Sequence, residues 1–485
     1  MDWLNIIFTA VYALLVVSAL GSVLFDNREP HRTIAWLLVI VAVPVLGLVL
    51  YAFFGQNLRR AYKARHRKAI SESVRWLQEN EDVRGRLLRT DLSQFPQRYD
   101  SLRLFLKKTC QAAAFRSPEP QIFSDGTDFL DALISDINAA QHHVHVEFFI
   151  FNDDGAGNRL AQALAQAAQR GVQTRLIYDD VGCWSVPRRV FRRLSEQGVE
   201  VQAYSRVHFR WMTHRVNYRN HRKLCIIDGQ TGYIGGMNIA DRYLHGQPRG
   251  TNWRDLMLRI TGEAVYGMQT IFLYDWGTCT KKPLIHPDFY PEIASASAEQ
   301  TAAMPFYQMA STEPFGNCHN MLLAYNHLIE NARERILIQT PYFMPSASLI
   351  EALQTAAMRG VHVQIMVPER MGSFWMTRAN QSYYQDLLDF GAELYAYTLG
   401  MLHAKLLVID DDFASVGSVN IDHRSLEDTF EDSAFIYSAP VAAELAARFA
   451  AEKKNCRYID LQSWNQRTRR RRFVESLMRI FTPLL

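Results

Sequence analysis

The sequence of 485 residues predicts an α/β protein in which two α/β/α repeats, packed as a pseudo-twofold pair, follow a two-helix transmembrane hairpin. Two long uncharged runs near the amino terminus predict the hairpin. Apolar strands alternating with amphipathic helices after residue 120 predict sheets that are covered by helices. A polar pattern that occurs once in each half of this region predicts that the region arose by duplication.

The two uncharged runs are Trp3–Phe25 and Thr33–Gly55, and each is long enough to cross a bilayer as a helix. Pro44 and Gly47 in the second run are tolerated in membrane helices. The linking segment Asp26–Arg32 is short and polar, so the two runs read as a hairpin. A cleaved signal peptide would need a basic start and a shorter apolar run. Two buried core helices are the weaker alternative for uncharged runs of this length.

A cluster of basic residues follows the second run and orients the hairpin. It outweighs Arg28 and Arg32 of the linking segment, so the positive-inside rule places the amino terminus and everything after residue 55 in the cytoplasm. Beside anionic head groups each basic residue contributes about 1 kcal/mol, which favours lipid contact over simple solvation. The cluster comprises Arg59, Arg60, Lys63, Arg65, Arg67 and Lys68.

The region after residue 120 has two halves with the same order of elements. Helices in both halves end at a glycine, and Ala-Gln-Arg-Gly-Val at 168–172 matches Ala-Met-Arg-Gly-Val at 357–361. We expect the hairpin with its basic segment at 1–70, a first repeat at 71–285 and a second repeat at 286–485. The expected strands are 144–151, 172–178, 199–204, 335–340, 361–367 and 393–397, and the expected helices are 158–170, 187–197, 346–359 and 378–390.

Two further segments mix basic and apolar side chains. The loop 205–220 interleaves four arginines with three large apolar residues, which suits a membrane-facing lip or a set of arginines paired with acids elsewhere. After the arginines at 467–472, the segment 473–481 places its apolar residues on one helical face. This carboxyl-terminal basic amphipathic helix would lie at the membrane interface or dock on the protein's own core.

The duplicated pattern consists of His, Lys two residues later, Asp seven later, Gly fourteen later and Asn seventeen later. A second copy of five matched positions is very unlikely to arise by chance. Histidine and lysine two residues apart on a strand face the same side, so each copy directs an imidazole and a cation to one place. The copies are His221, Lys223, Asp228, Gly235, Asn238 and His403, Lys405, Asp410, Gly417, Asn420.

This set of side chains suits a phosphate better than a metal. Zinc or magnesium would want more imidazoles or carboxylates, and the six scattered cysteines form no CxxC pair and are expected to be reduced thiols. Lysine and asparagine can hold phosphoryl oxygens while one imidazole attacks phosphorus and the other acts as a general acid. We therefore expect no metal and no cofactor. Asp228 and Asp410 end their strands, which favours a structural or orienting role.

The pattern resembles the phospholipase D signature HxKx4Dx6GxxN, and the whole chain resembles the bacterial cardiolipin synthases of that superfamily. Asn220 stands where some family members carry glutamine, which touches no catalytic position. The resemblance implies two phospholipase D-like repeats and metal-independent phosphatidyl transfer between two phosphatidylglycerol molecules, giving cardiolipin and glycerol through a phosphatidyl-histidine. It extends over Ala35–Leu38 with Pro44, Arg219–Lys223, Thr340–Phe343 with Pro345, Asn420–Asp422 with Arg424–Leu426, and Phe481–Leu485.

The resemblance also implies roles for residues. His221 would be the nucleophile and His403 the acid and then the base. The implied partners are phosphatidylglycerol, cardiolipin and anionic membrane lipids, without nucleic acid, and the implied location is the bacterial inner membrane, multi-pass, with the catalytic part cytoplasmic. The implied catalytic set is His221, Lys223, Asp228, His403, Lys405 and Asp410; the phosphate ligands are Asn238, Asn420 and Ser418; and the acids that follow each motif and orient its histidine are Asp255 and Glu431.

Other functions would use the same residues. A phospholipase D or phosphodiesterase would transfer to water, and only the hairpin favours a lipid acceptor and a drier site. A nuclease has no support beyond the shared motif, since the net charge of +4 indicates no polycation. A membrane-tethered structural protein is disfavoured because both copies of the pattern are intact. The acyl-chain preference, phosphatidylethanolamine as a donor and the oligomeric state, a homo-oligomer included, stay open.

Overall fold

The computed structural model describes residues 2–25, 30–43, 45–51, 70–207, 218–245, 252–294, 296–314, 316 and 318–482. The chain forms two compact units, one of residues 1–65 and 207–218 and the other of residues 66–206 and 219–485. The predicted basic cluster at 59–68, most of the arginine-rich loop at 205–220 and the last three residues lie outside the described residues.

The amino-terminal unit holds the helices α1 (Asp2–Phe25), α2 (Pro30–Ala42) and α3 (Leu46–Leu50). Residues Asn5–Phe25 of α1 are long and apolar enough to cross a membrane, as predicted for the first run. The second predicted span is not one helix, because α2 ends at Ala42 and α3 begins at Leu46. Proline 44 has no N–H to donate and Val45 has a φ of 62°, so the sequence between the two helices does not favour a continuous helix. The multi-pass topology stays a prediction.

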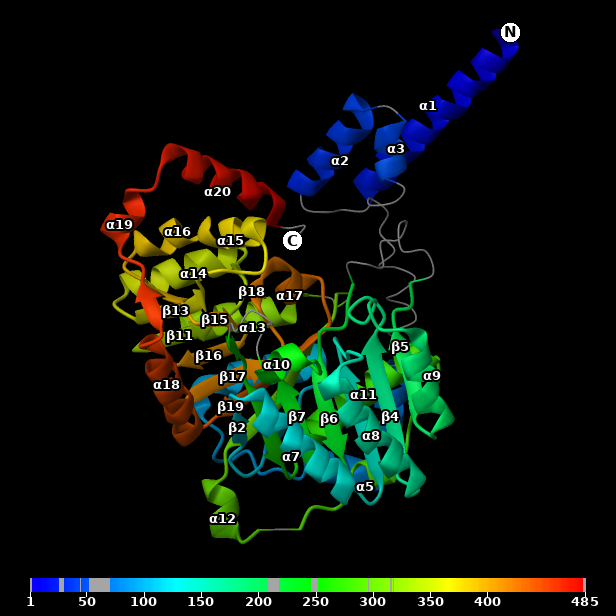
Figure 1. The fold of residues 1–485 in the computed structure, drawn as a ribbon, viewed down its shortest axis with the longest axis vertical. Helices are drawn as coiled ribbons and strands as arrows, with labels where there is room; N and C mark the ends of the chain where they lie inside the picture. The colour runs from blue at the N-terminus through cyan, green and yellow to red at the C-terminus, as the bar shows by residue number, and fades with distance from the viewer. Residues whose placement is uncertain are drawn as a thin grey trace. The chain divides into compact units, whose positions relative to one another are not determined.

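The first repeat is built on a sheet whose described strands run in the order β2-β9-β7-β6-β3-β4-β5 (Figure 1). β3, β4 and β5 pair in parallel and the other neighbours pair antiparallel. Val146 of β3 lies in the core under α7 and α8, and His145 on the opposite face stacks on Phe272 of α11. The elements are β2 (Gln121–Phe123), α7 (Gly126–Ala139), β3 (His143–Phe148), α8 (Gly155–Gln169), β4 (Gln173–Asp179), α9 (Arg188–Glu196), β5 (Glu200–Tyr204), β6 (Lys223–Ile227), β7 (Thr231–Gly235), β9 (Met257–Thr261) and α11 (Val265–Thr280).

The second repeat has the same strand order, β10-β19-β17-β16-β11-β13-β14, with β1 added beside β10 and β20 beside β14 among the described residues. The predicted duplication of an α/β unit is thereby confirmed. The elements are β1 (Ala114–Arg116), β10 (Phe306–Thr312), α13 (Asn320–Glu330), β11 (Arg335–Gln339), α14 (Ala347–Met358), β13 (His362–Pro368), α15 (Phe374–Gln381), α16 (Tyr384–Leu388), β14 (Glu393–Tyr397), β16 (Leu406–Ile409), β17 (Phe413–Gly417), β19 (Glu431–Tyr437), α18 (Ala439–Lys453) and β20 (Cys456–Tyr458).

The two repeats are interlocked along the chain. β1 precedes β2, the first strand of the first sheet, yet pairs antiparallel with β10 of the second sheet, and α6 (Asp100–Cys110) buries Leu102 and Leu106 in the second core. Two short parallel contacts also join the repeats: β8 (Asn252–Arg254) pairs with β15 (Gly400–Leu402), and Asn220 bridges to Phe430. The predicted division of the chain at residue 285 stays a prediction.

The last helix, α20 (Arg469–Phe481), lies along α15 and α16 (Figure 1). Its buried Glu475 accepts hydrogen bonds from Arg467 and Arg471, and its Met478 lies in the second core. The helix therefore docks on the protein's own core, one of the two alternatives left by the sequence. Phe473 and Ile480 remain about 70% exposed, at 69% and 71%.

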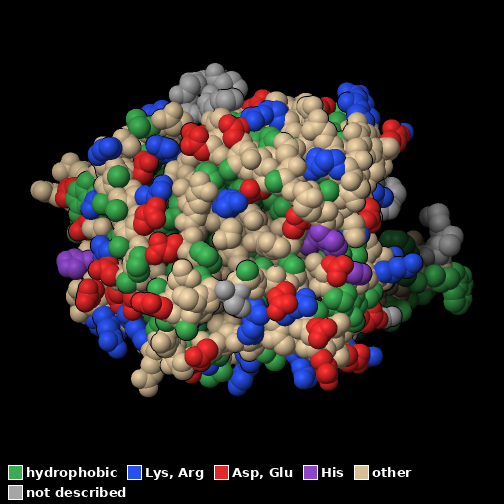
Figure 2. Space-filling model, turned by 90° about the horizontal axis from the view of Figure 1, so that it is seen from below, with side chains coloured by type: hydrophobic (Ala, Val, Ile, Leu, Met, Phe, Trp, Pro, Cys, Tyr) green, Lys and Arg blue, Asp and Glu red, His purple; other side chains and the backbone are tan. Residues whose placement is uncertain are grey.

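The remaining described elements lie at the edges and in the connections. On the face seen from below, Lys and Arg side chains are interspersed with Asp and Glu, so that face carries no patch of a single charge (Figure 2). The elements at the edges and in the connections are a helix at 70–79, α5 (Glu81–Leu88), α10 (Asp241–His245), α12 (Ala298–Ala303), β12 (Phe343–Met344), β18 (Ile421–Asp422), α17 (His423–Glu427), α19 (Leu461–Asn465) and the 3-10 turns Gln97–Tyr99 and Pro287–Phe289.

Candidate active site

Lys223 is the first residue of β6 and Lys405 lies immediately before β16, and each motif histidine lies two residues before its lysine, outside the strand. Lys223 and Lys405 are buried, with exposed fractions of 3% and 5%. Each lysine Nζ donates to the backbone carbonyl of the histidine two residues earlier. The two-residue spacing thus places each ammonium at the backbone carbonyl of its histidine, and Lys405 Nζ also lies 2.8 Å from His403 Nδ1.

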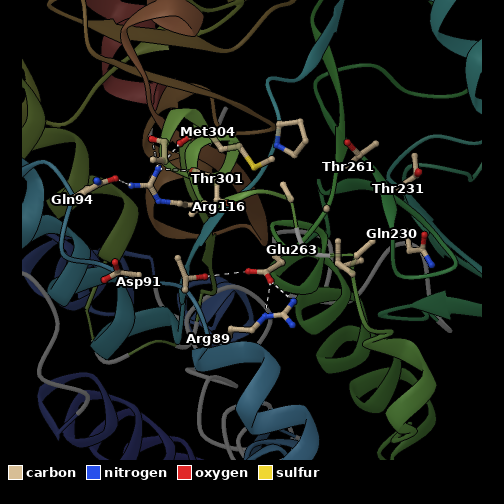
Figure 3. A pocket seen from close by; sticks show the side chains of 18 residues that line it. Arg89, Asp91, Gln94, Arg116, Gln230, Thr231, Thr261, Glu263, Thr301 and Met304 are labelled. Carbon is tan, nitrogen blue, oxygen red and sulfur yellow. Dashed lines mark hydrogen bonds and ion pairs between the residues drawn. The ribbon is translucent and has the colours of Figure 1, made fainter.

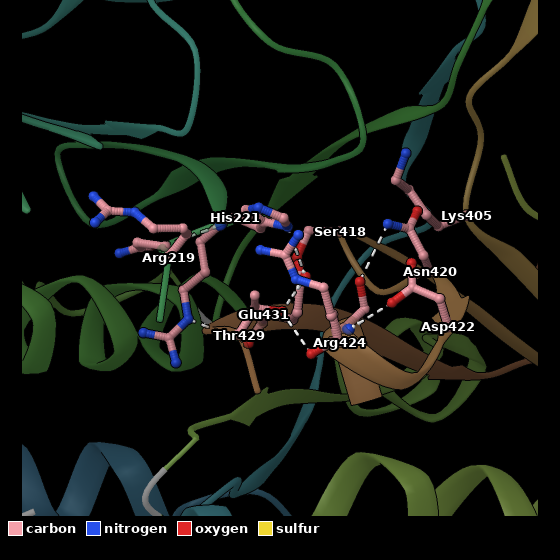
Figure 4. Close-up of polar contacts among 12 residues, drawn as sticks. Arg219, His221, Lys405, Ser418, Asn420, Asp422, Arg424, Thr429 and Glu431 are labelled. Carbon is pink, nitrogen blue, oxygen red and sulfur yellow. Dashed lines mark hydrogen bonds and ion pairs between the residues drawn. The ribbon is translucent and has the colours of Figure 1, made fainter. Parts of the chain in front are cut away.

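The histidines are held by carboxylates that are exchanged between the repeats. His221 Nδ1 lies 3.0 Å from Glu431 Oε1 (Figure 4). His403 Nδ1 lies 2.6 Å from Asp255 Oδ2. The backbone repeats the exchange, because the N–H of each histidine donates to the carbonyl of the residue before the partner acid, at 2.9 and 2.6 Å. The expectation that each acid orients the histidine of its own motif is therefore wrong: the pairs are crossed.

Aromatic rings pack against both histidines. The Phe149 ring centre lies 4.3 Å from that of His221. Trp253 and Tyr243 lie 5.2 and 5.7 Å from the His403 ring. The side chains of His221 and His403 are 21% and 13% exposed, so both are reachable from one side only.

The charged groups of the site shift one another's protonation. Burial lowers the pKa of Lys405 to about 7, against the attraction of Asp255, and burial also lowers the pKa of Lys223. Burial and then the neighbouring Lys405 charge lower the pKa of His403 to about 4. Burial opposes ionisation of Glu431, but His221 and Lys223 outweigh it and lower the pKa of this carboxyl. Burial makes the charged form of both lysines unfavourable, and an anion bound beside them would stabilise that charge. The site is therefore attractive to an anion.

The three predicted phosphate ligands all have protein partners. Asn238 accepts from Ile150 N at 3.0 Å and donates to the Tyr243 hydroxyl at 2.7 Å. Asn420 donates to Ser425 Oγ at 3.2 Å, while Ser418 Oγ accepts the Asp432 N–H at 3.0 Å and donates to the Asp432 carbonyl at 3.3 Å. These contacts fix the side chains beside the motifs (Figure 4), and their binding of phosphate stays a prediction.

The second motif has Ser418 where the first has a glycine, and this difference has a steric cause. Gly236 occupies the matching position in the first copy, and a Cβ there would lie 2.0 Å from Asp255 Oδ1. A side chain at residue 236 would displace the carboxylate that holds His403. The Gly-Gly and Gly-Ser forms of the motif thus follow from where Asp255 sits.

Asp228 and Asp410 are not in the site. Each follows the far end of its strand with a positive φ, 53° and 49°, and its carboxylate accepts backbone N–H groups at the start of the adjacent strand. For Asp228 these donors belong to residues 141–143, at 2.8–2.9 Å, and for Asp410 to residues 333–335, at 2.8–3.1 Å. Arg98 also pairs with Asp410. Their inclusion in the catalytic set is corrected, and the structural role expected from their position is what the contacts show.

One buried residue of the first motif was not singled out from the sequence. Arg222 is 1% exposed, pairs with Asp275, and donates to the carbonyls of Thr312 at 3.0 Å and Glu431 at 3.2 Å. It therefore supports the backbone of the acid that holds His221. The second motif has Ala404 at this position, and that difference between the copies was the available signal.

A large cavity elsewhere in the molecule is a poor site for chemistry. It has a volume of about 790 Å³ and is lined by residues such as Arg89, Arg116 and Glu263, with no motif residue among them (Figure 3). Its charges are already satisfied, because Arg89 pairs with Glu263 at 2.5 Å and Arg116 donates to three carbonyls at 301, 302 and 304.

Comparisons with known proteins agree with this architecture. The chain matches the family described as "Cardiolipin synthase, PLD-like domain" at residues 133–276 and 325–453, and "Phospholipase_D-nuclease N-terminal" at residues 14–56. It is 36% identical to the major cardiolipin synthase ClsA of Bacillus subtilis (strain 168), over 99% of each chain. It is 34% identical to the cardiolipin synthase of Oceanobacillus iheyensis, again over 99% of each. Among solved structures, phosphatidylserine synthase of Haemophilus influenzae Rd KW20 is similar in fold, with a TM-score of 0.56 and 14% identity over 80% of this chain and 98% of that one.

Proposed function

The chain belongs to the cardiolipin synthase family of the phospholipase D superfamily and is a phosphatidyltransferase, and we propose that it joins two phosphatidylglycerol molecules into cardiolipin and glycerol. The observation that supports this most directly is the crossed pairing of two histidines with two carboxylates around two buried lysines. Such a site offers two imidazoles of opposite duty to one phosphodiester.

In the first step, His221 Nε2 attacks the phosphorus of the donor while Glu431 holds the Nδ1–H. The bond from phosphorus to the head-group glycerol breaks, and His403 gives the leaving oxygen its proton. Lys223 and Lys405 offset the negative charge on the phosphoryl oxygens. The products are a phosphatidyl-histidine and free glycerol.

In the second step, a hydroxyl of another phosphatidylglycerol gives its proton to His403 and attacks the same phosphorus. The bond from His221 to phosphorus breaks and cardiolipin leaves. Both histidines return to their starting states, so the cycle consumes neither a metal nor a cofactor. The acid of the first step is the base of the second, as microscopic reversibility requires.

The two histidines differ in their surroundings and in their exposure, and these differences bear on which of them is the nucleophile. Burial and Lys405 lower the pKa of His403 to about 4, so the imidazole is neutral before substrate binds. As the acid of the first step His403 must be protonated, and a phosphodiester anion bound between the two lysines would favour this by offsetting their charge. We assign the nucleophile to His221 because its side chain is the more exposed, at 21% against 13% for His403.

The assignment is tested by trapping the intermediate. Phosphatidylglycerol labelled in its phosphate is mixed with the full chain, quenched under denaturing alkaline conditions and analysed by peptide mass spectrometry. We expect label on the peptide with His221, and losses of about 10³-fold or more in cardiolipin formation for both His221→Ala and His403→Ala. Label on the His403 peptide would reverse the roles.

A hydrolase would make phosphatidic acid with the same residues. Purified protein supplied with phosphatidylglycerol and a chelator should release glycerol and cardiolipin in equal amounts. Predominant phosphatidic acid would instead favour the hydrolase alternative.

The proposal includes a place at the membrane. α1 is long and apolar enough to span a bilayer, and the exposed Phe473 and Ile480 of α20 suit contact with a membrane surface. We infer a multi-pass inner-membrane protein with its catalytic unit in the cytoplasm, on the basis of the basic residues that follow the second apolar run.

A further inference from the structure

Each motif continues to an arginine that the function has not yet used. Arg242 lies four residues after Asn238, and Arg424 lies four residues after Asn420. They stand on the short helices α10 and α17, which occupy equivalent places in the two repeats. The duplication therefore supplies two arginines beside the site in addition to the two lysines.

Arg242 is one aromatic ring away from His403. Its guanidinium carbon lies 5.4 Å from the Tyr243 ring centre and 5.8 Å from that of Trp253. These are the two rings that pack against His403, at 5.7 and 5.2 Å. The rings place a fixed positive charge on the His403 side of the site.

Among the described residues, which omit 246–251, no carboxylate forms an ion pair with Arg242, and its Nε is buried without a hydrogen-bond partner. The adjacent Asp241 is engaged elsewhere, because it accepts the N–H groups of Gly155 and Ala156. Arg254, whose carbonyl accepts the His403 N–H, is already paired with Glu452 at 3.3 Å. Arg242 is thus a half-buried cation that lacks an anion.

The second substrate of the proposed reaction is itself an anion. Its attacking hydroxyl and its own phosphate are joined by the three carbons of one glycerol, so that phosphate must lie near the site when the hydroxyl reaches phosphorus. In an in-line displacement His221 and the entering oxygen lie on opposite sides of phosphorus. The acceptor therefore enters on the His403 side, where glycerol left.

We propose that Arg242 binds the phosphate of the acceptor phosphatidylglycerol and thereby selects a lipid acceptor over glycerol or water. This inference rests on the proposed function. The donor phosphate lies between Lys223 and Lys405, and the acceptor phosphate lies against Arg242, so each phosphate of cardiolipin has its own cation. Arg242 sets specificity and takes no part in bond making.

The test compares two acceptors in one reaction. Full-length protein in mixed micelles receives phosphatidylglycerol and radiolabelled glycerol. Labelled phosphatidylglycerol reports transfer to a neutral acceptor, and cardiolipin reports transfer to an anionic one. The ratio of the two products does not depend on how much protein is folded, so a partly misfolded variant still gives an answer.

We expect Arg242→Met, which keeps the length of the side chain without its charge, to lower the ratio of cardiolipin to labelled phosphatidylglycerol by about tenfold or more. Arg242→Lys should lose less, because it keeps the charge. Arg448→Met, which removes an arginine paired with Glu444 on the surface, should leave the ratio unchanged.

Two results would overturn the inference about Arg242, and a third would refute the proposed function. An unchanged ratio in Arg242→Met overturns the inference. An equal loss of both products also overturns it, since Arg242 would then act on the fold or on the donor. Wild-type protein that labels phosphatidylglycerol or makes phosphatidic acid, but forms no cardiolipin, refutes the proposed function instead.

Discussion

The two motif histidines occupy equivalent positions but have different neighbours. Nδ1 of His403 lies 2.6 Å from Asp255 Oδ2 and 2.8 Å from Lys405 Nζ. Nδ1 of His221 lies 3.0 Å from Glu431 Oε1. The extra ammonium beside His403 is a reason, after burial, for its low pKa, so the duplicated site has become chemically asymmetric.

Lys405 makes substrate capture dependent on pH. A lysine whose pKa is lowered to about 7 is charged below that pH and neutral above it, whereas a phosphodiester stays anionic throughout. We expect kcat/KM for a water-soluble short-chain phosphatidylglycerol to fall as the pH rises through 7. The kcat limb should lie at higher pH, because bound phosphate raises the pKa of Lys405.

Lys405→Arg serves as the control for this profile. A guanidinium does not lose its proton in this range, so the variant should lose the basic limb whatever its maximal rate. A wild-type kcat/KM that is flat between pH 6 and 9 would contradict the assignment.

At the scale of elements, the pair of Asp255 with His403 depends on a parallel strand pair of three residues in each strand, whereas the pair of Glu431 with His221 follows the single bridge between Asn220 and Phe430. β8 pairs with β15 so that Leu402 lies opposite Arg254, which sets His403 beside Asp255. Gly400 begins β15 with a φ of 152°, and a Cβ there would lie 2.1 Å from the Asn252 carbonyl oxygen. Only glycine fits this contact, which therefore fixes the register of the site.

We expect Gly400→Ala to lower kcat by about tenfold or more while the sheets remain folded, because Asp255 and His403 move apart. Circular dichroism and the turnover number measure the two effects separately. Gly372→Ala, at a position with open space around it, is the matched control and should retain activity. Normal turnover in Gly400→Ala would show that the strand pair is dispensable.

The sequence predicted the strands, the glycine-terminated helices and the duplicated motifs because these depend on local periodicity. It could not predict the exchange of Asp255 and Glu431, because the paired residues are 148 and 210 positions apart and each acid follows its own motif equally well. The interruption between α2 and α3 was not predicted for a different reason. Membrane helices tolerate proline, so Pro44 alone does not indicate that a helix ends. Arg222 was indicated only by a difference between the two copies, since the second copy has Ala404 at the matching position.

At the scale of the whole molecule, neither repeat contains a finished site. The first repeat supplies His221 with Asp255, and the second supplies His403 with Glu431, so each histidine lacks its acid until both sheets are in place. β1 and α6 strengthen this dependence, since they precede the strands of the first sheet in the chain and complete the second core. We therefore expect activity to require the assembled pair of repeats.

Because one chain supplies both crossed pairs, two inactive variants should not rescue each other. We expect His221→Ala and His403→Ala, expressed together in one cell that lacks other cardiolipin synthases, to make no more cardiolipin than either alone. Lipid analysis measures the product, and immunoblotting confirms that both chains accumulate. Restored synthesis would mean that the repeats of one site come from two chains, as in a swapped homo-oligomer. A tandem fusion of the wild-type chain with either variant, which should be active in both cases, controls for dominant interference.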